Sequence, residues 1–247
     1  MDVGFGAGPG DEDYCRDNFP KARRPTIAMG FEADPSITTV EVAQPLSICL
    51  LGFSADAPIQ VTIRYPGGHL ERITAPKPTC NAAYCTSEAA WAALPGHALG
   101  RYGVTAVQGK RSATGRITVN AAELPVLMVI GSTGDIETRF TARPGTTIGI
   151  ALAGWGSRRS TDLLFYYTPS FKWCAESCTR MRFRAATTVT INAGGAIYWL
   201  RTSPTDPPGC YGVNTMPPLE ALWAGSGPPY PQVLTSMSNA HQFCLRR

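Results

Sequence analysis

Apolar residues along this chain occur in short runs separated by turn residues, and one such run is repeated. Residues 48–53, ICLLGF, return 102 positions later as residues 150–155, IALAGW. In residues 59–65 apolar side chains alternate with Gln60, Thr62 and Arg64, and the equivalent stretch 163–167 keeps Leu163, Phe165 and Tyr167. Alternation with a period of two is typical of a strand with one face in a core. The pattern therefore predicts strands, and the recurrence predicts that one structural unit occurs twice.

A second repeated motif supports two copies of one domain. Residues 100–104, GRYGV, return as residues 209–213, GCYGV, now 109 positions later. The two copies then differ by a small net insertion, and residues 120–125 between them are a plausible linker. A chain of 247 residues is long enough for two domains of about 100 to 125 residues.

The predicted organisation is an N-terminal arm (1–25), domain 1 (26–120), domain 2 (125–216) and a C-terminal tail packed on domain 2 (217–247). Each domain contains short apolar runs bounded by Gly, Pro, Asn or Asp, which favours an all-β sandwich. The predicted strands are 26–29, 37–42, 46–51, 59–65, 69–74, 103–107 and 115–119 in domain 1, and 126–130, 138–142, 146–152, 162–167, 181–185, 187–191, 196–201 and 212–215 in domain 2.

The repeated motif 100–104/209–213 also carries a family resemblance. In immunoglobulin sandwiches a Tyr near the start of the penultimate strand donates a hydrogen bond back across the corner, and Tyr102 and Tyr211 stand where that residue would stand. The chain therefore resembles tandem immunoglobulin-like domains of secreted actinobacterial-type proteins, over residues 26–216. It departs from antibody domains because neither copy has a Cys pair that would link its two sheets. Such a fold resemblance implies no particular activity.

Composition agrees with a turn-rich β protein. Charged residues make up 16% of the chain, against a usual value of roughly 25%, while 25 Gly and 21 Pro are present. No apolar run approaches the roughly 18 residues of a membrane helix, and the longest, 124–130, has the length of a buried strand. We expect no membrane span.

The chain has eight cysteines, and four of them form two closely spaced pairs, Cys80 with Cys85 and Cys174 with Cys178. We expect two locally closed disulfide loops in equivalent places, and hence an extracellular protein. Residues 1–13 lack a basic and an apolar segment, so we expect a secretion signal to have been removed before this numbering begins. A four-thiolate zinc site is the alternative, but 88 residues separate the two pairs and they belong to different domains.

Alternation predicts how the other four cysteines point. Because the neighbours of Cys49 face inward, Cys49 lies on the outer face of its strand, and Cys210 beside an inward Tyr211 does likewise. Outward cysteines are suited to anchoring a segment on the surface. We therefore expect Cys15–Cys49 to fasten the arm and Cys210–Cys244 the tail. The pairing Cys15–Cys244 with Cys49–Cys210 would instead join the domains, and the sequence leaves it open.

Basic residues suggest one candidate binding surface. Domain 2 contains nine Arg/Lys and five Asp/Glu, whereas residues 26–119 contain seven and six. Arg180, Arg182 and Arg184 alternate along a predicted strand and would line one wet face, and Arg158–Arg159 adds a basic turn. Such charges often only keep a strand soluble, but they also suit an acidic protein or an anionic cell-surface polymer. A net charge of +4 in a secreted chain does not favour nucleic acid.

Aromatic loops are a second candidate, since Trp173 adjoins the Cys174 loop and Trp223 lies in the tail. Exposed tryptophans can fill a partner's pocket, although Trp223 could equally fasten the tail. His69, His97 and His241 have no metal-ligand companion at helical or strand spacing, and they are expected on the surface or in turns. No motif predicts a metal, a cofactor or a catalytic residue. The predicted function is non-catalytic binding, adaptor or structural, with an extracellular hydrolase or protease inhibitor as the alternative.

Overall fold

In a computed structural model, strands are the main elements of the residues that the structure describes. These are residues 15–16, 19, 22–30, 38–80, 84–132, 136, 140–171, 181–216, 233–234 and 242–247. The chain divides into two compact units, the first of Met1–Ala93 and His97–Asn120, the second of Leu94–Gly96 and Ala121–Arg247. None of the described residues belongs to a long apolar helix of the kind that crosses a membrane.

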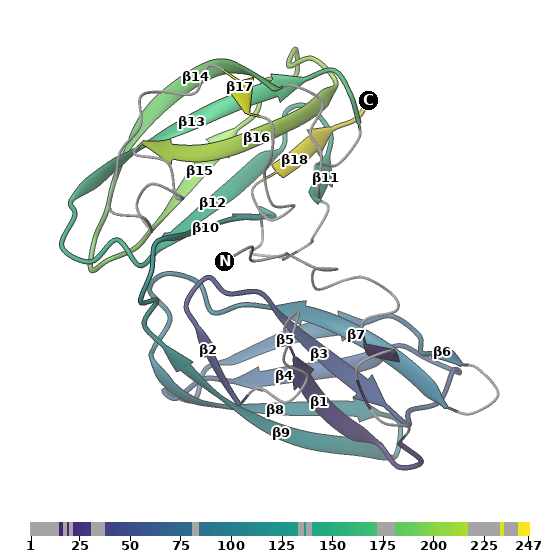
Figure 1. The fold of residues 1–247 in the computed structure, drawn as a ribbon. Helices are drawn as coiled ribbons and strands as arrows, with labels where there is room; N and C mark the ends of the chain where they lie inside the picture. Colours follow the sequence, from purple (N-terminus) through teal and green to yellow (C-terminus); the bar gives the residue numbers. More distant parts are fainter. Residues whose placement is uncertain are drawn as a thin grey trace. The chain divides into compact units, whose positions relative to one another are not determined.

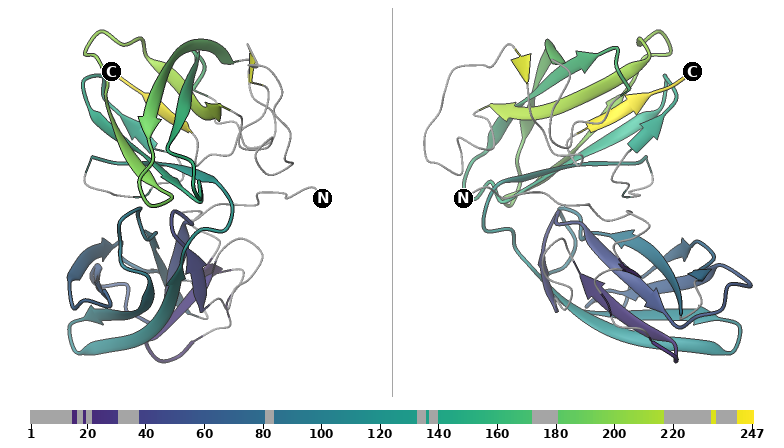
Figure 2. Two further views of the ribbon diagram at one scale, coloured as in Figure 1. Left: turned by 90° about the vertical axis from the view of Figure 1, so that its left-hand side faces the viewer. Right: turned by 45° about the vertical axis from the view of Figure 1, so that its right-hand side comes forward.

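The first unit is a sandwich of two sheets. One sheet has the strand order β1-β3-β7-β6 and the other β2-β9-β8-β4-β5, with the long β8–β9 hairpin teal in Figure 2. Inward side chains alternate along these strands, as in β4, where Ile59, Val61 and Ile63 are fully buried. The strands are β1 (Thr26–Gly30), β2 (Thr39–Glu41), β3 (Leu46–Leu51), β4 (Ile59–Arg64), β5 (Leu70–Ala75), β6 (Thr79–Cys80), β7 (Cys85–Trp91), β8 (Gly100–Gln108) and β9 (Arg111–Asn120).

The second unit repeats this plan. Its sheets have the orders β10-β12-β15 and β11-β18-β16-β13-β14-β17. The strands are β10 (Val126–Ile130), β11 (Phe140–Ala142), β12 (Thr147–Ala153), β13 (Ser160–Thr168), β14 (Met181–Thr190), β15 (Ala196–Arg201), β16 (Gly209–Met216), β17 (Val233–Leu234) and β18 (Gln242–Leu245). Side chains from both sheets form one core, which includes Ile150, Trp155 and Phe243. Trp155 is thus a core residue, as its match to Phe53 predicts.

The two units share one immunoglobulin-like topology. The orders β1-β3-β7 and β10-β12-β15 match, as do β2-β9-β8-β4-β5 and β11-β18-β16-β13-β14. In both, the short second strand runs parallel to the last one, β2 beside β9 and β11 beside β18, whereas all other pairs are antiparallel. The repeated residues occupy equivalent strands. Ile48 lies in β3 and Ile150 in β12, and each of these is the second strand of the smaller sheet in its unit. The fold class predicted from the pattern, an all-β immunoglobulin-like sandwich, is confirmed.

The last strand of the second sandwich lies in the segment assigned above to the tail. β18 is an inner strand between β11 and β16 (Figure 1), with Phe243 and Leu245 fully buried in the core. In the first unit Gly109 and Lys110 join the equivalent strands β8 and β9, whereas residues 217–241 separate β16 from β18. The second sandwich therefore extends to residue 245 and does not end at residue 216.

Three details of the predicted strands also differ. β7 was not predicted, because its sequence CTSEAAW lacks the β-branched and aromatic run that marks a strand. β14 is one long strand where two were predicted. The two short Cys loops are not equivalent, because Cys80–Cys85 joins β6 to β7 whereas residues 169–180 connect β13 to β14.

Three of the four predicted disulfides are present in the part of the chain that the structure describes: Cys15–Cys49, Cys80–Cys85 and Cys210–Cys244. Cys174 and Cys178 lie outside the described residues. Cys15 and Cys49 are buried with Leu51 in a small cluster separate from the main core, against Phe19 and Ala22. The outward Cys49 thus holds the arm on the sheet, and the pairing that would join the two domains does not occur.

A glycine follows the same strand in each unit and lets another part of the chain approach. Gly52 and Gly154 both have positive φ, +70° and +80°. A Cβ atom at Gly52 would collide with the backbone carbonyl of Arg24, and one at Gly154 with that of Leu124. The glycine of the repeated motif is therefore required by backbone geometry in both copies.

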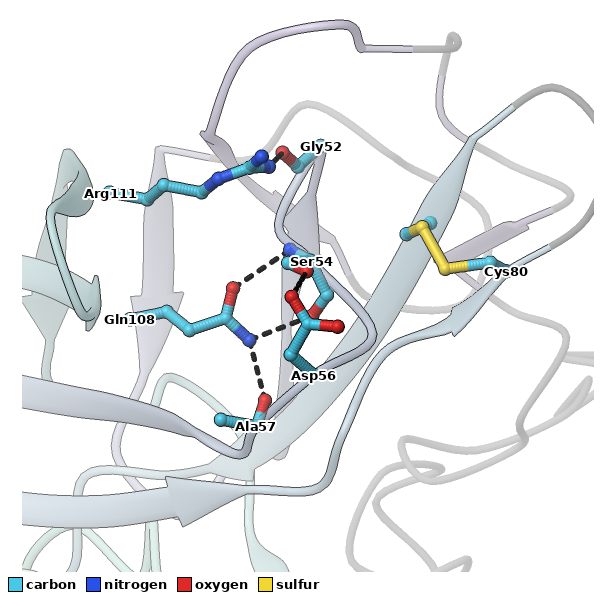
Figure 3. The surroundings of a disulfide bond; sticks show 8 residues. Gly52, Ser54, Asp56, Ala57, Cys80, Gln108 and Arg111 are labelled. Atoms are coloured by element: carbon cyan, nitrogen blue, oxygen red, sulfur yellow. Dashed lines mark hydrogen bonds between the residues drawn. A yellow bond between two sulfur atoms is a disulfide. The ribbon is translucent and has the colours of Figure 1, made fainter.

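The loop after Gly52 is held by side chains of the β8–β9 hairpin (Figure 3). The Gln108 side chain accepts a hydrogen bond from the Ser54 amide at 2.8 Å and donates to the carbonyls of Ser54 and Ala57 at 2.7 and 2.5 Å. Arg111 donates to the Gly52 carbonyl at 3.2 Å. These bonds pair loop carbonyls that no neighbouring strand reaches, and they fasten the loop to the β8–β9 hairpin.

Candidate functional site

Both units have a tyrosine corner, as the repeated motif predicts. The Tyr102 hydroxyl donates to the Ala98 carbonyl at 2.6 Å, and the Tyr211 hydroxyl donates to the Pro207 carbonyl at 2.9 Å. In each case the acceptor is four residues upstream, in the loop before the strand. Next to each lies a second tyrosine, Tyr65 or Tyr167, with ring centroids 4.8 and 5.1 Å apart. The sequence predicted the corner tyrosines but not the polar groups gathered around them.

In the first unit a carboxylate is held at the corner by two aromatic donors. The Tyr65 hydroxyl donates to Glu71 Oε2 at 2.5 Å, and Trp91 Nε1 donates to the same oxygen at 3.0 Å. Burial, and then the neighbouring Glu71, raise the pKa of the Tyr65 hydroxyl well above its usual range. The hydroxyl therefore stays protonated and serves as a fixed donor. Glu71 thus links β5 to β7 and to the end of β4.

His97 completes this group. Its Nδ1 lies 3.3 Å from the Tyr65 hydroxyl, and its ring packs edge-on against that tyrosine at 5.0 Å. Because the hydroxyl donates its proton to Glu71, the contact requires Nδ1–H of His97 as donor. His69 also packs edge-on against Tyr65, at 5.1 Å between ring centroids, and is exposed. His69 lies in the expected turn, whereas His97 is half-buried; His241 lies outside the described residues.

We expect the first unit to lose stability in mild acid through His97. Burial lowers the pKa of His97 below its ordinary value of 6.5, opposed in part by the charge of Glu71 and reinforced by His69. Because the folded-state pKa is depressed, the unfolded chain binds the proton more readily. The contribution of neutral His97 to the free energy of unfolding is therefore complete above pH 6.5, and it is lost as the pH falls through the folded-state pKa. Urea unfolding of the wild type and His97→Gln from about pH 7.5 to about pH 5 tests this. Equal losses in both proteins would contradict it.

The corner of the second unit holds a charge pair at the same place. Arg184 donates to the Tyr211 hydroxyl at 2.7 Å and to Asp206 at 2.6 Å, and its guanidinium lies 5.2 Å from the Tyr211 ring centroid. Asp206 and His97 are equivalent, since each stands five residues before its corner tyrosine. The first unit thus has a carboxylate on β5 and a histidine in the loop before β8. The second unit has an arginine on β14 and a carboxylate in the loop before β16.

A β-bulge sets Arg184 apart from the other predicted arginines. Phe165 pairs with Ala185 and Tyr166 with Phe183, so Arg184 is the extra residue. A bulge interrupts the alternation of side chains and re-aims the residue that it contains. Arg184 is therefore engaged with Asp206 and Tyr211, whereas Arg182 is exposed and Arg180 lies outside the described residues. The structure does not place Arg184 in a free stripe with Arg182.

Reversing these two arginines should have unequal effects. Arg184→Glu removes the donor to Tyr211 and sets like charges beside each other, although the pair is 37% and 19% exposed and partly screened. We expect a loss of about 1–2 kcal/mol in the free energy of unfolding. The matched change Arg182→Glu should stay within about 0.5 kcal/mol. Denaturant unfolding of both variants measures the difference, and similar losses would contradict this account of the bulge.

The basic turn lies away from Arg182. Arg158 and Arg159 are exposed in the loop before β13, where the Arg158 amide closes a turn on the Trp155 carbonyl. Ser160, next to this turn, pairs with Thr190, whereas Arg182 pairs with Tyr167. Seven residues of extended strand separate Ser160 from Tyr167, which is roughly 23 Å at 3.3 Å per residue. Arg158 and Arg159 therefore lie near one end of β13, and Arg182 lies beside the other end.

The predicted aromatic loops lie outside the described residues, since neither Trp173 nor Trp223 is described. The structure instead exposes another tryptophan, Trp199 on β15, with 47% of its surface accessible. The sequence predicted this strand but not its exposure. The sequence signal that could have predicted this exposure is the short connection from β14 to β15. It leaves no room for a strand equivalent to β6, which covers the matching edge in the first unit.

Comparisons with known proteins identify no family. No protein-family model and no curated protein matches the chain. Among solved structures, alpha-2-macroglobulin from Escherichia coli activated by trypsin is 11% identical, with 81% of this chain and 15% of that chain covered and a TM-score of 0.29. The tetra-tandem repeat in the extending region of a large adhesion protein is 15% identical, with 90% and 48% covered and a TM-score of 0.27. Such scores are low, so the immunoglobulin-like assignment rests on strand order and pairing.

Proposed function

We propose that this protein is a secreted, non-catalytic binding or structural module that docks on an acidic protein surface or an anionic cell-surface polymer. The observation that carries the proposal is the exposure of Arg158, Arg159 and Arg182 in the copy that holds the excess of basic residues. Exposed guanidinium groups form paired hydrogen bonds with carboxylates, sulfates and phosphates.

Secretion is supported by the disulfides, because such bonds persist in oxidising compartments outside the cytosol. Cys15–Cys49 and Cys210–Cys244 each span 34 positions and join distant parts of the chain. A non-catalytic role is supported by the polar groups at the two corners. Glu71 and Asp206, which could otherwise act in acid–base chemistry, are each bonded to groups that fasten loop to strand.

Retention on immobilised dextran sulfate and on polyglutamate tests the proposal. The wild type should be retained at low salt and released as salt screens the charges, since the screening length is only about 8 Å at 0.15 M. The triple variant Arg158→Glu, Arg159→Glu, Arg182→Glu should bind at least about tenfold more weakly and remain folded. The matched control changes the net charge equally on the first unit: Arg72→Glu, Lys77→Glu, Arg116→Glu, all exposed.

Two results would count against the proposal. Equal loss of retention in both triple variants would mean that net charge alone, and not these arginines, causes retention. Turnover of a peptide or glycoside substrate that is abolished by Glu71→Gln in a folded protein would favour the hydrolase alternative.

A further inference from the structure

Among the strands that the structure describes, β15 forms an open edge of its sheet, whereas the equivalent strand of the first unit is covered. In the first unit the equivalent strand β7 carries β6 on its outer side, paired through Thr79 and Cys80 and closed by the disulfide Cys80–Cys85. In the second unit β14 turns directly into β15 through Asn192–Gly195, with Ala193 and Gly194 at positive φ. Within the described part of the chain, β12 is the only strand that pairs with β15.

The sequence of this edge is poorly protected against further pairing. Natural edge strands are blocked by Lys, Pro, inward charges or bulges. β15 reads AIYWLR, and its single charge, Arg201, stands at its end. Its pairing with β12 is regular from Ala196 to Arg201, without a bulge. In the described part of the second unit, β15 therefore presents six residues of uninterrupted, nearly uncharged edge.

Apolar side chains on both faces of β15 remain incompletely covered. On the inner face, Ala196, Tyr198 and Leu200 pack against the core but are only partly buried. On the outer face, the Trp199 ring lies over Gly149 of β12, where a Cβ atom would collide with it, and is still 47% exposed. An added strand would form hydrogen bonds with the backbone groups of β15 that face away from β12, and it would cover apolar surface on both faces.

We infer that β15 is a docking edge for a second copy of this chain, which adds its own β15 in antiparallel orientation. Antiparallel pairing keeps inner residues opposite inner residues only if the two-fold axis passes between one residue and the same residue of the second copy. With the axis at Tyr198, Trp199 faces Ile197 of the partner subunit and Ala196 faces its Leu200. Arg201 then faces Gly195 of the partner subunit, so no like charges meet, and each Trp–Ile pair is a favourable cross-strand contact.

This inference names one partner of the binding module proposed above and rests on that function. The two β10-β12-β15 sheets would join into one continuous sheet across the dimer. In a symmetric dimer the edge of β15 contacts the same edge of the second copy, so the edge must not repel itself. β15 meets this condition because it is apolar and has a single charge, at its end. A peptide from another protein is the competing occupant, and it would leave the isolated chain monomeric.

Sedimentation velocity of the full chain from about 5 to 200 µM tests the inference, together with amide hydrogen exchange. A monomer–dimer equilibrium is expected, and exchange of the amides of residues 196–201 should slow by at least about tenfold at the higher concentration. Trp199→Lys and Ile197→Lys should each shift the equilibrium to monomer. Leu124→Lys, which replaces a 56% exposed leucine outside β15, should leave it unchanged.

Each outcome decides the matter. A monomer at 200 µM, or a dimer without added protection in β15, would overturn the inference, and the exchange result needs no variant that might fail to fold. Dextran sulfate retention of the wild type separates the two proposals. If the wild type is retained but stays monomeric, the proposed function stands and this inference fails. If the wild type dimerises through β15 but is not retained, this inference stands and the proposed function fails.

Discussion

A chain that ends after His241 is expected to lose the fold of its second sandwich. This truncation removes β18, whose Phe243 and Leu245 are 1% and 0% exposed. Loss of two such side chains costs roughly 3–5 and 2–5 kcal/mol, and loss of the Cys210–Cys244 link costs roughly 3–4 kcal/mol more. The sum is comparable with the whole stability of a typical domain, about 5–15 kcal/mol. Calorimetry should show one cooperative transition fewer, with Cys210→Ser added to avoid a free thiol.

A chain that lacks only Arg247 is the control, because this residue is exposed and follows β18. It should unfold like the full chain. Phe243→Ala in the full chain should reproduce part of the loss, about 3–5 kcal/mol, and shows that the strand matters rather than the chain length. Retention of every transition by the chain ending at His241 would mean that the last residues only lie on the surface of the second sandwich.

Replacing the repeated glycine by alanine should be the most damaging single-methyl change in either unit. Gly52→Ala and Gly154→Ala each place a side chain at positive φ, which costs about 1–2 kcal/mol, and each drives the new Cβ atom into a backbone carbonyl. Arg24 and Leu124 each lie two residues before a paired strand, so their carbonyls cannot move far without disturbing the first pairs of β1 and β10. We therefore expect a total loss of about 3–5 kcal/mol in the unfolding free energy of the affected unit.

Gly68 and Gly156 provide matched controls, one in each unit. Both have positive φ, +85° and +55°, but nothing lies within 4 Å of the Cβ position. Alanine there should cost only the conformational term, about 1–2 kcal/mol. Denaturant unfolding of the four variants separates strain from collision. Equal losses at Gly154 and Gly156 would contradict the claim that the close approach of Leu124 requires the glycine.

The sequence predicted those features that depend on near neighbours along the chain. The alternation of residues 59–65 identified β4, the repeated Gly-x-Tyr-Gly motif identified both tyrosine corners, and the outward direction of Cys49 favoured a disulfide with Cys15. Each prediction needs only the period of a strand and the direction of one side chain. β7 was missed for the same reason, since its small and polar residues are buried by neighbours that the local pattern does not reveal.

Features that join distant segments were decided only in the tertiary structure. β18 is too short and too far from β16 to be recognised as the last strand of a sandwich, and its place is settled by pairing with β11 and β16. Strict alternation would keep Arg184 beside Arg182, but a bulge against β13 directs it to Asp206 and Tyr211.

By itself, then, the sequence determined the fold class, the repeat and the outward direction of Cys49 and Cys210, because these follow from strand periodicity and side-chain direction. The tertiary structure alone decided where the second sandwich ends, that Cys15 pairs with Cys49 and Cys210 with Cys244, that Arg184 bonds to Asp206, and that β15 is an edge among the described strands. These depend on strand pairing between residues far apart in the chain. Such pairing is set by the free energy of the whole sheet, to which every strand contributes.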